Sequence, residues 1–368
     1  MTPSKILLIK LRALGDTILA TAPLLELQRA YPNSNIQILV PKAWASLFDG
    51  FSGIQKIWTY ERKNSATARA RSLARLAYHL RQEKFDCVIN LHASPSSSLL
   101  AFSTGARLRS IHFHGHTHRN RYSTVEIPDK GILKPVIERD MDTLRALGID
   151  VPAGRLPHLP IQMSEIQEAN SFIQQIGLKP PILGLGLGAS RPTKIWPMNR
   201  FALLAFEWAQ KTEGSVIAFS GPTEASLQKV FLDEFDRALS LSALTTQARA
   251  ETRRRVITVH DLPLRKLTSL LSQISVFAGN DSGPRHLAVA LGTPTLTLFG
   301  PEHPIEWHPY PKDRHPYLFH ENLPCRKDVD PGMPPWCGIQ ECTLYDHQCM
   351  KLIGVDSVLA ECLRINRS

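Results

Sequence analysis

Three short segments place glycine beside charged or hydroxyl side chains at the end of an apolar run. They are Leu14-Gly15-Asp16, residues 184–196 (GLGLGASRPTKIW) and residues 279–286 (GNDSGPRH). The apolar runs are typical of buried parallel strands, and parallel sheets bind ligands beyond the carboxyl ends of their strands. We therefore expect the three segments to contribute to a ligand site.

Asp16 follows the turn that Gly15 allows after the first predicted strand. A carboxylate in that position, facing a cleft, could take a proton from an attacking hydroxyl group. Aspartate is also favoured at the beginning of a helix, where its side chain accepts a bond from a backbone N–H group. The residues alone leave both interpretations of Asp16 open, the base and the helix cap.

Segment 184–196 combines the backbone N–H groups of its glycines with the hydroxyl groups of Ser190 and Thr193 and the ammonium group of Lys194. These groups suit a diphosphate. The glycine spacing loosely matches a dinucleotide-binding pattern, but two prolines prevent a helix from starting at once, as that pattern requires. We therefore predict a diphosphate site here and not a dehydrogenase.

In segment 279–286, Pro284 suits the first turn of a helix, where its missing N–H group costs nothing. The free N–H groups of Gly283, Arg285 and His286 would point out of the positive end of that helix, where a phosphate is stabilised. An ordinary helix cap would explain one polar residue of the segment but not the whole cluster. The segment therefore predicts a second phosphate-binding element.

Around these segments, predicted strands and helices alternate in two consecutive series, separated by a linker at 151–160 that holds three prolines. The first series has strands at 5–10, 36–40 and 87–91 and helices at 17–30, 69–84, 94–102 and 139–147. The second has strands at 182–187, 215–220, 276–278 and 295–299 and helices at 165–176, 200–212, 224–235, 265–273 and 284–291. We predict an α/β fold of two Rossmann-like domains.

The chain of 368 residues has a formal net charge of +10, which favours anionic partners. We expect no nucleic-acid partner, because aromatic residues make up only 7% of the chain and no stacking motif accompanies the arginines. The chain has neither a signal-peptide pattern nor an apolar run of about 20 residues. We therefore expect a cytoplasmic protein or one that lies against a membrane surface.

Three motifs carry a family resemblance: strand-LGD-helix near the amino terminus, GAS-x-x-x-K-x-W-P in mid-chain, and NDSGPxHLAxALGTPTLTLFGP from residue 280. Together they resemble glycosyltransferase family 9, the ADP-heptose:lipopolysaccharide heptosyltransferases. Residues 138–149 (ERDMDTLRALGI) resemble the helix that ends the first domain of that family. The resemblance covers most of residues 5–303 and implies GT-B architecture, with two Rossmann-like domains facing an inter-domain cleft.

The resemblance also implies a domain organisation. Residues 1–160 would form the acceptor-binding domain, and residues 161–350 would form the nucleotide-sugar-binding domain. A closing helix within residues 351–368 would pack back on the first domain, as is common in GT-B proteins.

In that family, Asp16 matches the catalytic base, which deprotonates the acceptor hydroxyl group as it attacks the anomeric carbon. Lys194 matches the lysine that holds the donor diphosphate and stabilises the departing ADP. The other donor-binding matches are Ser190 and Thr193 at the phosphates, Glu224 near the nucleoside, Asp281 at the sugar, and Ser282, Gly283 and His286 along the pyrophosphate. One carboxylate suffices because the leaving-group charge falls on ADP, and inversion would follow from a single displacement.

The resemblance thus implies an inverting transfer of heptose, or a related sugar, from ADP-heptose to a lipopolysaccharide core or similar anionic glycolipid. No metal or other cofactor is required, and the protein would lie at the inner face of the cytoplasmic membrane. A sugar-nucleotide epimerase of the same architecture is one alternative. A non-catalytic nucleotide-sugar-binding protein is another, although the presence of both Asp16 and Lys194 argues against it.

Residues 107–121 (RLRSIHFHGHTHRNR) place four histidines, at 112, 114, 116 and 118, at alternate positions among arginines. A metal site is one interpretation, but alternation on an extended segment separates the side chains by about 6–7 Å. We favour a face for the anionic acceptor that includes Arg107, Arg119 and Arg121, with a solvated loop as the alternative. The basic helix at 69–84 could likewise lie against anionic headgroups or present a solvated face.

Four cysteines are grouped near the carboxyl terminus, namely Cys325, Cys337, Cys342 and Cys349. Their spacing lacks the paired C-x2-C of a zinc knuckle, and cytosolic thiols rarely form disulfides. We therefore favour thiols without a ligand, and a structural metal held by these four residues is the alternative.

Overall fold

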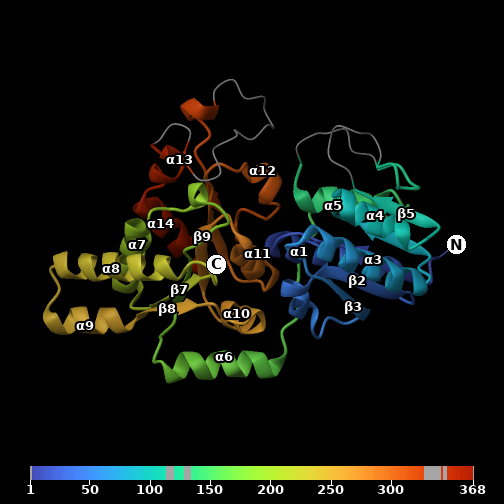
Figure 1. Cartoon of the computed structure of the whole chain (residues 1–368). Helices are drawn as coiled ribbons and strands as arrows, with labels where there is room; N and C mark the ends of the chain where they lie inside the picture. Colours follow the sequence, from blue (N-terminus) through green and yellow to red (C-terminus); the bar gives the residue numbers. More distant parts are fainter. Residues whose placement is uncertain (1, 113–119, 128–133, 327–340, 343–345, 368) are drawn as a thin grey trace. The chain divides into compact units, whose positions relative to one another are not determined.

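The computed structural model describes residues 2–112, 120–127, 134–326, 341–342 and 346–367 (Figure 1). The chain divides into two compact units, unit 1 at Met1–Pro160 and unit 2 at Ile161–Ser368. Each unit has one parallel β-sheet with helices packed against it. Among the residues described, no helix is long and apolar enough to cross a bilayer.

Unit 1 has a five-stranded sheet in the order β3-β2-β1-β4-β5, with parallel neighbours throughout. Its strands are β1 (Lys5–Ile9), β2 (Asn35–Pro41), β3 (Ile54–Tyr60), β4 (Cys87–Asn90) and β5 (Leu108–Ile111). Its helices are α1 (Leu14–Leu19), α2 (Thr21–Ala30), α3 (Ala66–Gln82), α4 (Pro95–Ser103) and α5 (Val136–Arg145), with a 3-10 helix η1 at Lys42–Phe48. The central strand β1 reads KILLI because both faces of a parallel sheet are covered.

Unit 2 has a six-stranded parallel sheet in the order β11-β10-β9-β6-β7-β8. Its strands are β6 (Ile182–Gly186), β7 (Ser215–Ser220), β8 (Val256–His260), β9 (Val276–Asn280), β10 (Thr295–Leu298) and β11 (Tyr317–Leu318). Its longer helices are α6 (Met163–Gln175), α7 (Met198–Thr212), α8 (Ala225–Leu241), α9 (Thr246–Arg254), α10 (Leu264–Leu271), α11 (Gly283–Ala290) and α14 (Val355–Asn366). Its short helical turns are α12 (Pro304–Trp307), α13 (Gln348–Lys351), and the 3-10 helices η2 (Pro192–Lys194) and η3 (Pro324–Arg326).

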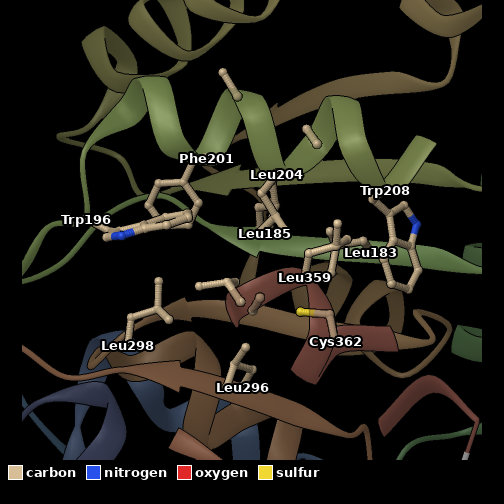
Figure 2. Packing of buried hydrophobic residues seen from close by; sticks show 14 of the residues in the cluster. Leu183, Leu185, Trp196, Phe201, Leu204, Trp208, Leu296, Leu298, Leu359 and Cys362 are labelled. Carbon is tan, nitrogen blue, oxygen red and sulfur yellow. The ribbon is translucent and has the colours of Figure 1, made fainter. Parts of the chain in front are cut away.

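The hydrophobic core of unit 2 lies between the sheet and helices α7, α8 and α14, and Figure 2 shows the part beside α7 and α14. The indole ring of Trp196 meets the ring of Phe201 edge to face, with the ring centroids 4.9 Å apart. Aromatic pairs of this geometry add about 0.5–1.5 kcal/mol to the gain from burial. The packing fixes the beginning of α7, which directly follows segment 184–196.

The closing helix α14 packs in this core, and its buried face consists of Val358, Leu359, Cys362 and Ile365. It contacts α7, β9 and β10 of unit 2. The packing of its apolar face is thus within unit 2, and a contact of the helix with the first domain stays a prediction. Its apolar face is already used by the sheet of the second unit.

A stability measurement can test this placement of α14. Leu359 is buried, so Leu359→Ala should lower the free energy of unfolding of unit 2 by about 2–5 kcal/mol, through lost burial and the cavity left behind. Leu352 is 52% exposed, and Leu352→Ala is the matched control, expected to stay within about 0.5 kcal/mol of the unchanged protein. Denaturant unfolding followed by tryptophan fluorescence compares the two, and equal effects would contradict the packing described.

Candidate active site

The predicted segments lie where the strand order of each sheet reverses. In unit 2 the chain places β7 and β8 on one side of β6, and then β9, β10 and β11 on the other. The crevice between β6 and β9 is therefore a topological switch point, where doubly wound sheets bind ligands. Segments 184–196 and 279–286 leave these two strands. In unit 1 the reversal lies between β1 and β4, and Asp16 follows β1.

Asn280, the last residue of β9, fastens the two segments of unit 2 to each other. Its side-chain carbonyl accepts a hydrogen bond from the Trp196 N–H group at 2.9 Å, and its amide donates to the Leu187 carbonyl at 2.9 Å. Asn280 is fully buried, so these bonds do not compete with water. The sequence motif contained this residue, but the sequence analysis gave it no role. It is a positioning residue.

Asp281 joins two cations, one from each segment. Lys194 Nζ lies 2.6 Å from its Oδ2, and Arg285 Nη2 lies 2.5 Å from its Oδ1. Burial would raise the pKa of Asp281, but Arg285 and Lys194 outweigh it and hold that pKa well below its ordinary value. The carboxylate is therefore ionised and fixes both cations. Arg285 is fully buried, and the sequence analysis gave its side chain no role, although an Asp-Arg spacing of four across the beginning of a helix was the available signal.

Ser282 is the N-cap residue of α11, yet its side chain makes no capping hydrogen bond. Within the described residues, Ser282 Oγ and Arg285 Nη1 are buried without a hydrogen-bond partner. Buried polar atoms are normally paired, and unpaired ones indicate a ligand or water that completes them. Here they stand beside the free N–H groups that begin α11, at Gly283 and onward. Together, the Ser282 hydroxyl group, the Arg285 guanidinium group and these N–H groups can bind an anion.

Glu224 lies against segment 184–196. Its Oε2 accepts a hydrogen bond from the Gly221 N–H group at 2.7 Å, and it directly precedes α8. A Cβ atom on Gly188 would lie only 1.9 Å from the Glu224 carboxylate, so only glycine leaves room for it. The structure thus brings Glu224 to the same segment as Lys194.

The remaining predicted donor residues differ in exposure. Ser190 is exposed, and Thr193 is buried with its Oγ1 unpaired among the described residues. His286 is turned inward, where its Nδ1 is hydrogen-bonded to the Tyr310 hydroxyl group. Burial, together with the neighbouring Arg285, lowers the pKa of His286 well below its ordinary value. His286 is therefore a neutral side chain, and any charge on a ligand is met by the lysine and arginine.

Asp16 lies inside helix α1 and does not cap it. The helix begins at Leu14 with Ala13 as its N-cap, three residues before the predicted beginning at residue 17. The helix-cap interpretation of Asp16 is therefore wrong. Asp16 is only 5% exposed, and its Oδ1 has no hydrogen-bond partner within the described part of the chain. Lys10 Nζ lies 3.9 Å from this oxygen.

The predicted acceptor arginines do not gather around Asp16. Arg107 directly precedes β5 and interacts with Asp86, at the amino ends of the strands, whereas Asp16 follows the carboxyl end of a parallel strand. Arg121 is exposed, with its guanidinium carbon 4.5 Å from the Tyr122 ring centroid. Arg119 lies outside the described residues, as do the histidines at 114, 116 and 118, while the fourth, at 112, is buried at the end of β5.

The cysteine segment contacts the donor side of unit 2. Its described cysteines are Cys325, Cys342 and Cys349, which line one small cavity and form no disulfide. Cys337 lies outside the described residues. His347 borders the same cavity and donates from Nε2 to the Thr193 carbonyl at 2.6 Å. In the part of the chain that is described, no three His, Cys, Asp or Glu side chains are placed to hold a metal ion.

The chain is similar in sequence to known proteins. The model of glycosyltransferase family 9 (heptosyltransferase) matches residues 73–334. Lipopolysaccharide heptosyltransferase 3 from Escherichia coli K12 is 23% identical over 326 residues, covering 86% of this chain and 89% of the relative. Lipopolysaccharide core heptosyltransferase OpsX from Haemophilus influenzae is 24% identical over 312 residues, covering 84% of this chain and 82% of the relative.

Solved structures show the same fold. A glycosyl transferase family 9 protein from Veillonella parvula superposes with a TM-score of 0.75 at 20% identity, covering 99% of this chain and 97% of the other. The E. coli ADP-heptose lps heptosyltransferase II gives a TM-score of 0.73 at 21% identity, covering 99% and 98%. Because the family model matches most of the chain, the protein belongs to glycosyltransferase family 9 and is a glycosyltransferase of GT-B architecture.

Proposed function

We propose that the protein transfers heptose, or a closely related sugar, from ADP-heptose to a lipopolysaccharide core or similar glycolipid. The names of the relatives support this donor and acceptor class. The observation that carries the proposal is the anion-accepting group at the beginning of α11. There the unpaired Ser282 Oγ and Arg285 Nη1 lie beside a lysine that a buried carboxylate holds in place.

On the donor side, Lys194 and Arg285 neutralise the charge that develops on ADP as the sugar leaves. Fixed cations and N–H groups of this kind stabilise a leaving group without a general acid, and a single donor is typically worth about 100–1000-fold in rate. Ser190 and Thr193 complete the phosphate contacts, and Glu224 binds a hydroxyl group of the nucleoside. Asp281 orients the two cations, since each of its oxygens is bonded to one of them.

On the acceptor side, Asp16 acts as the base. A hydroxyl oxygen of the acceptor attacks the anomeric carbon, its proton passes to Asp16, and the bonding electrons of the breaking C–O bond pass to ADP. One displacement inverts the configuration at that carbon. The unpaired Asp16 Oδ1 supports this role, because it is the oxygen free to accept the proton.

We also propose that the protein works at the cytoplasmic face of the inner membrane, where an anionic glycolipid is available. Helix α3 supports this location. It contains no acidic residue, and it exposes Arg71, Arg75 and Arg81 beside Tyr78, which is 63% exposed. Basic and aromatic side chains on one helix suit an anionic lipid surface.

The decisive experiment supplies ADP-heptose with and without a heptose-deficient core acceptor, and measures ADP release and the mass of the glycolipid. Transfer predicts ADP release together with one added heptose, and only when the acceptor is present. A changed sugar nucleotide without acceptor would instead establish the epimerase. Binding without turnover in either case would leave only a nucleotide-sugar-binding protein.

Replacing the base gives a first prediction. Asp16→Asn should lower kcat by about 100-fold or more, because the amide cannot accept the proton, and should leave ADP affinity unchanged. Asp49 is exposed in the same unit, and Asp49→Asn is the matched control, expected to retain full activity. Full turnover by Asp16→Asn would remove Asp16 from the mechanism.

The donor side gives a second prediction. Gly188→Ala puts a methyl group where the Glu224 carboxylate lies, so this carboxylate must move and the Kd for ADP should rise by about tenfold or more. Gly354→Ala is the matched control, because a Cβ atom there meets nothing within 4 Å. Isothermal titration with ADP compares the variants. Equal affinities would show that Glu224 takes no part in nucleotide binding.

A further inference from the structure

Lys10 directly follows β1 and precedes Asp16 in the chain. Its side chain is buried, and the residue is only 1% exposed. Its ammonium group donates to Asp140 Oδ2 at 2.6 Å and to the Leu91 carbonyl at 3.3 Å. A buried charge is tolerated only when it is paired and hydrogen-bonded. Asp140, from α5, is the direct ion-pair partner of this lysine inside unit 1.

The same ammonium group lies 3.9 Å from Asp16 Oδ1, beyond hydrogen-bonding distance. The other oxygen, Oδ2, lies 3.7 Å from Arg12 Nε. Asp16 is therefore held near two cations while Oδ1 remains without a hydrogen bond in the described part of the chain. Its Oδ1 is therefore the oxygen that is placed to accept a proton.

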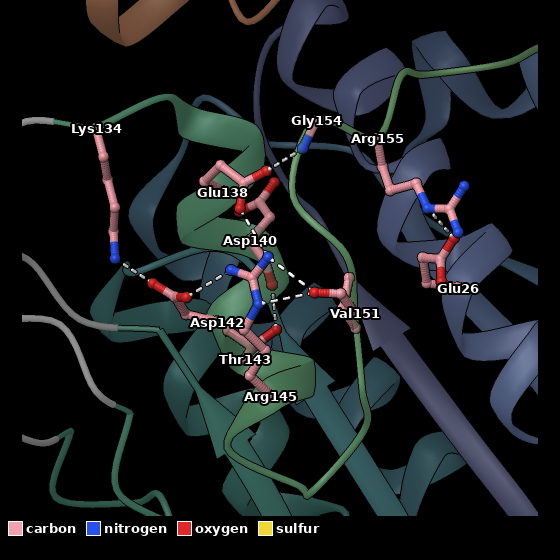
Figure 3. Close-up of polar contacts among 10 residues, drawn as sticks. All are labelled: Glu26, Lys134, Glu138, Asp140, Asp142, Thr143, Arg145, Val151, Gly154 and Arg155. Carbon is pink, nitrogen blue, oxygen red and sulfur yellow. Dashed lines mark hydrogen bonds and ion pairs between the residues drawn. The ribbon is translucent and has the colours of Figure 1, made fainter.

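Asp140 lies on helix α5, whose other polar contacts are drawn in Figure 3. Arg145 donates to Glu138 at 2.8 Å and to Asp142 at 2.9 Å, both on the same helix. It also donates to the Val151 carbonyl at 3.2 Å, which ties the chain after α5 to the helix. Asp140 is thus carried by an element fixed at several points along its length.

The charge on Asp140 depends on Lys10. Burial raises the pKa of Asp140 to about 6, although Lys10 opposes the rise, and Asp16 and Arg139 are the other charged groups that act on it. Around Asp16 the charged groups are Lys10, Arg12 and Asp140. The carboxylates of Asp140 and Asp16 thus both lie near the Lys10 ammonium group, and only Asp140 is in direct contact with it.

We propose that Asp140 is a positioning residue that holds Lys10 away from Asp16 Oδ1, and so leaves this oxygen to accept the proton of the acceptor hydroxyl group. The inference rests on the proposed role of Asp16 as base. Without the Asp140 charge, a shift of about 1 Å would bring Lys10 into a direct bond with Asp16. A carboxylate oxygen that accepts a charge-assisted hydrogen bond is a weaker base.

Three variants test the inference through the pH dependence of kcat. Asp140→Asn should lower kcat at least tenfold at pH 7.5 and move the acidic limb of the profile to lower pH, because Lys10 now pairs with Asp16. Lys10→Met should move the acidic limb to higher pH. The double variant, Asp140→Asn with Lys10→Met, should be faster than Asp140→Asn alone, because the lysine that blocks the base is gone.

Asp142→Asn is the matched control on the same helix, since Asp142 pairs with Arg145 and has no contact with Lys10 in the residues described. It should lower the melting temperature without moving the acidic limb. The inference is overturned if Asp140→Asn leaves the limb in place, behaves like Asp142→Asn, or is no slower than the double variant. ADP binding and thermal melting establish that each variant is folded.

The outcomes also separate this inference from the proposed function. If Asp16→Asn retains turnover, the assignment of the base fails, whatever Asp140 does. If Asp16→Asn is inactive and Asp140→Asn behaves like Asp142→Asn, the base stands and only the positioning role fails.

Discussion

The carboxylate of Asp281 is the charge on which the site of unit 2 depends. It is buried between Lys194, which follows β6, and Arg285, which belongs to α11. Without it two cations would face each other in a poorly solvated place, and breaking a buried ion pair typically costs about 3–5 kcal/mol. This anion thus links the two loops and orients both positive groups, and Glu302 lies 3.7 Å from the same lysine. Asn280 also joins the same two segments, through hydrogen bonds between uncharged groups.

Much of the fold could be predicted from the sequence, because apolar runs and amphipathic stretches alternate regularly. The strands that were missed are β3, β5, β8 and β11, each at the edge of its sheet. Edge strands are covered on fewer sides, so β3 mixes exposed and half-buried residues and shows no continuous apolar run. The beginning of α1 was placed too late because Ala13 provides no capping side chain to mark it.

The site was predictable where its residues share a motif and unpredictable where they do not. Asp16 and Lys194 stand in motifs, so family resemblance named them. Lys10 and Asp140 are 130 residues apart, and no local pattern could have paired them. Arg107 was chosen for its charge, but the direction of β5 places it at the amino ends of the strands. The charge of a residue does not show whether it lies at the amino ends or at the carboxyl ends of the strands.

The burial of α14 bears on how the chain is made. Unit 1 contains only residues that leave the ribosome first, so its core can close while the rest is still being synthesised. The core of unit 2 needs Val358, Leu359 and Cys362, which follow every strand of its sheet in the chain. Until α14 emerges, apolar surface on β9, β10 and α7 stays uncovered. Chaperones therefore have the most apolar surface to bind while the second unit is still incomplete.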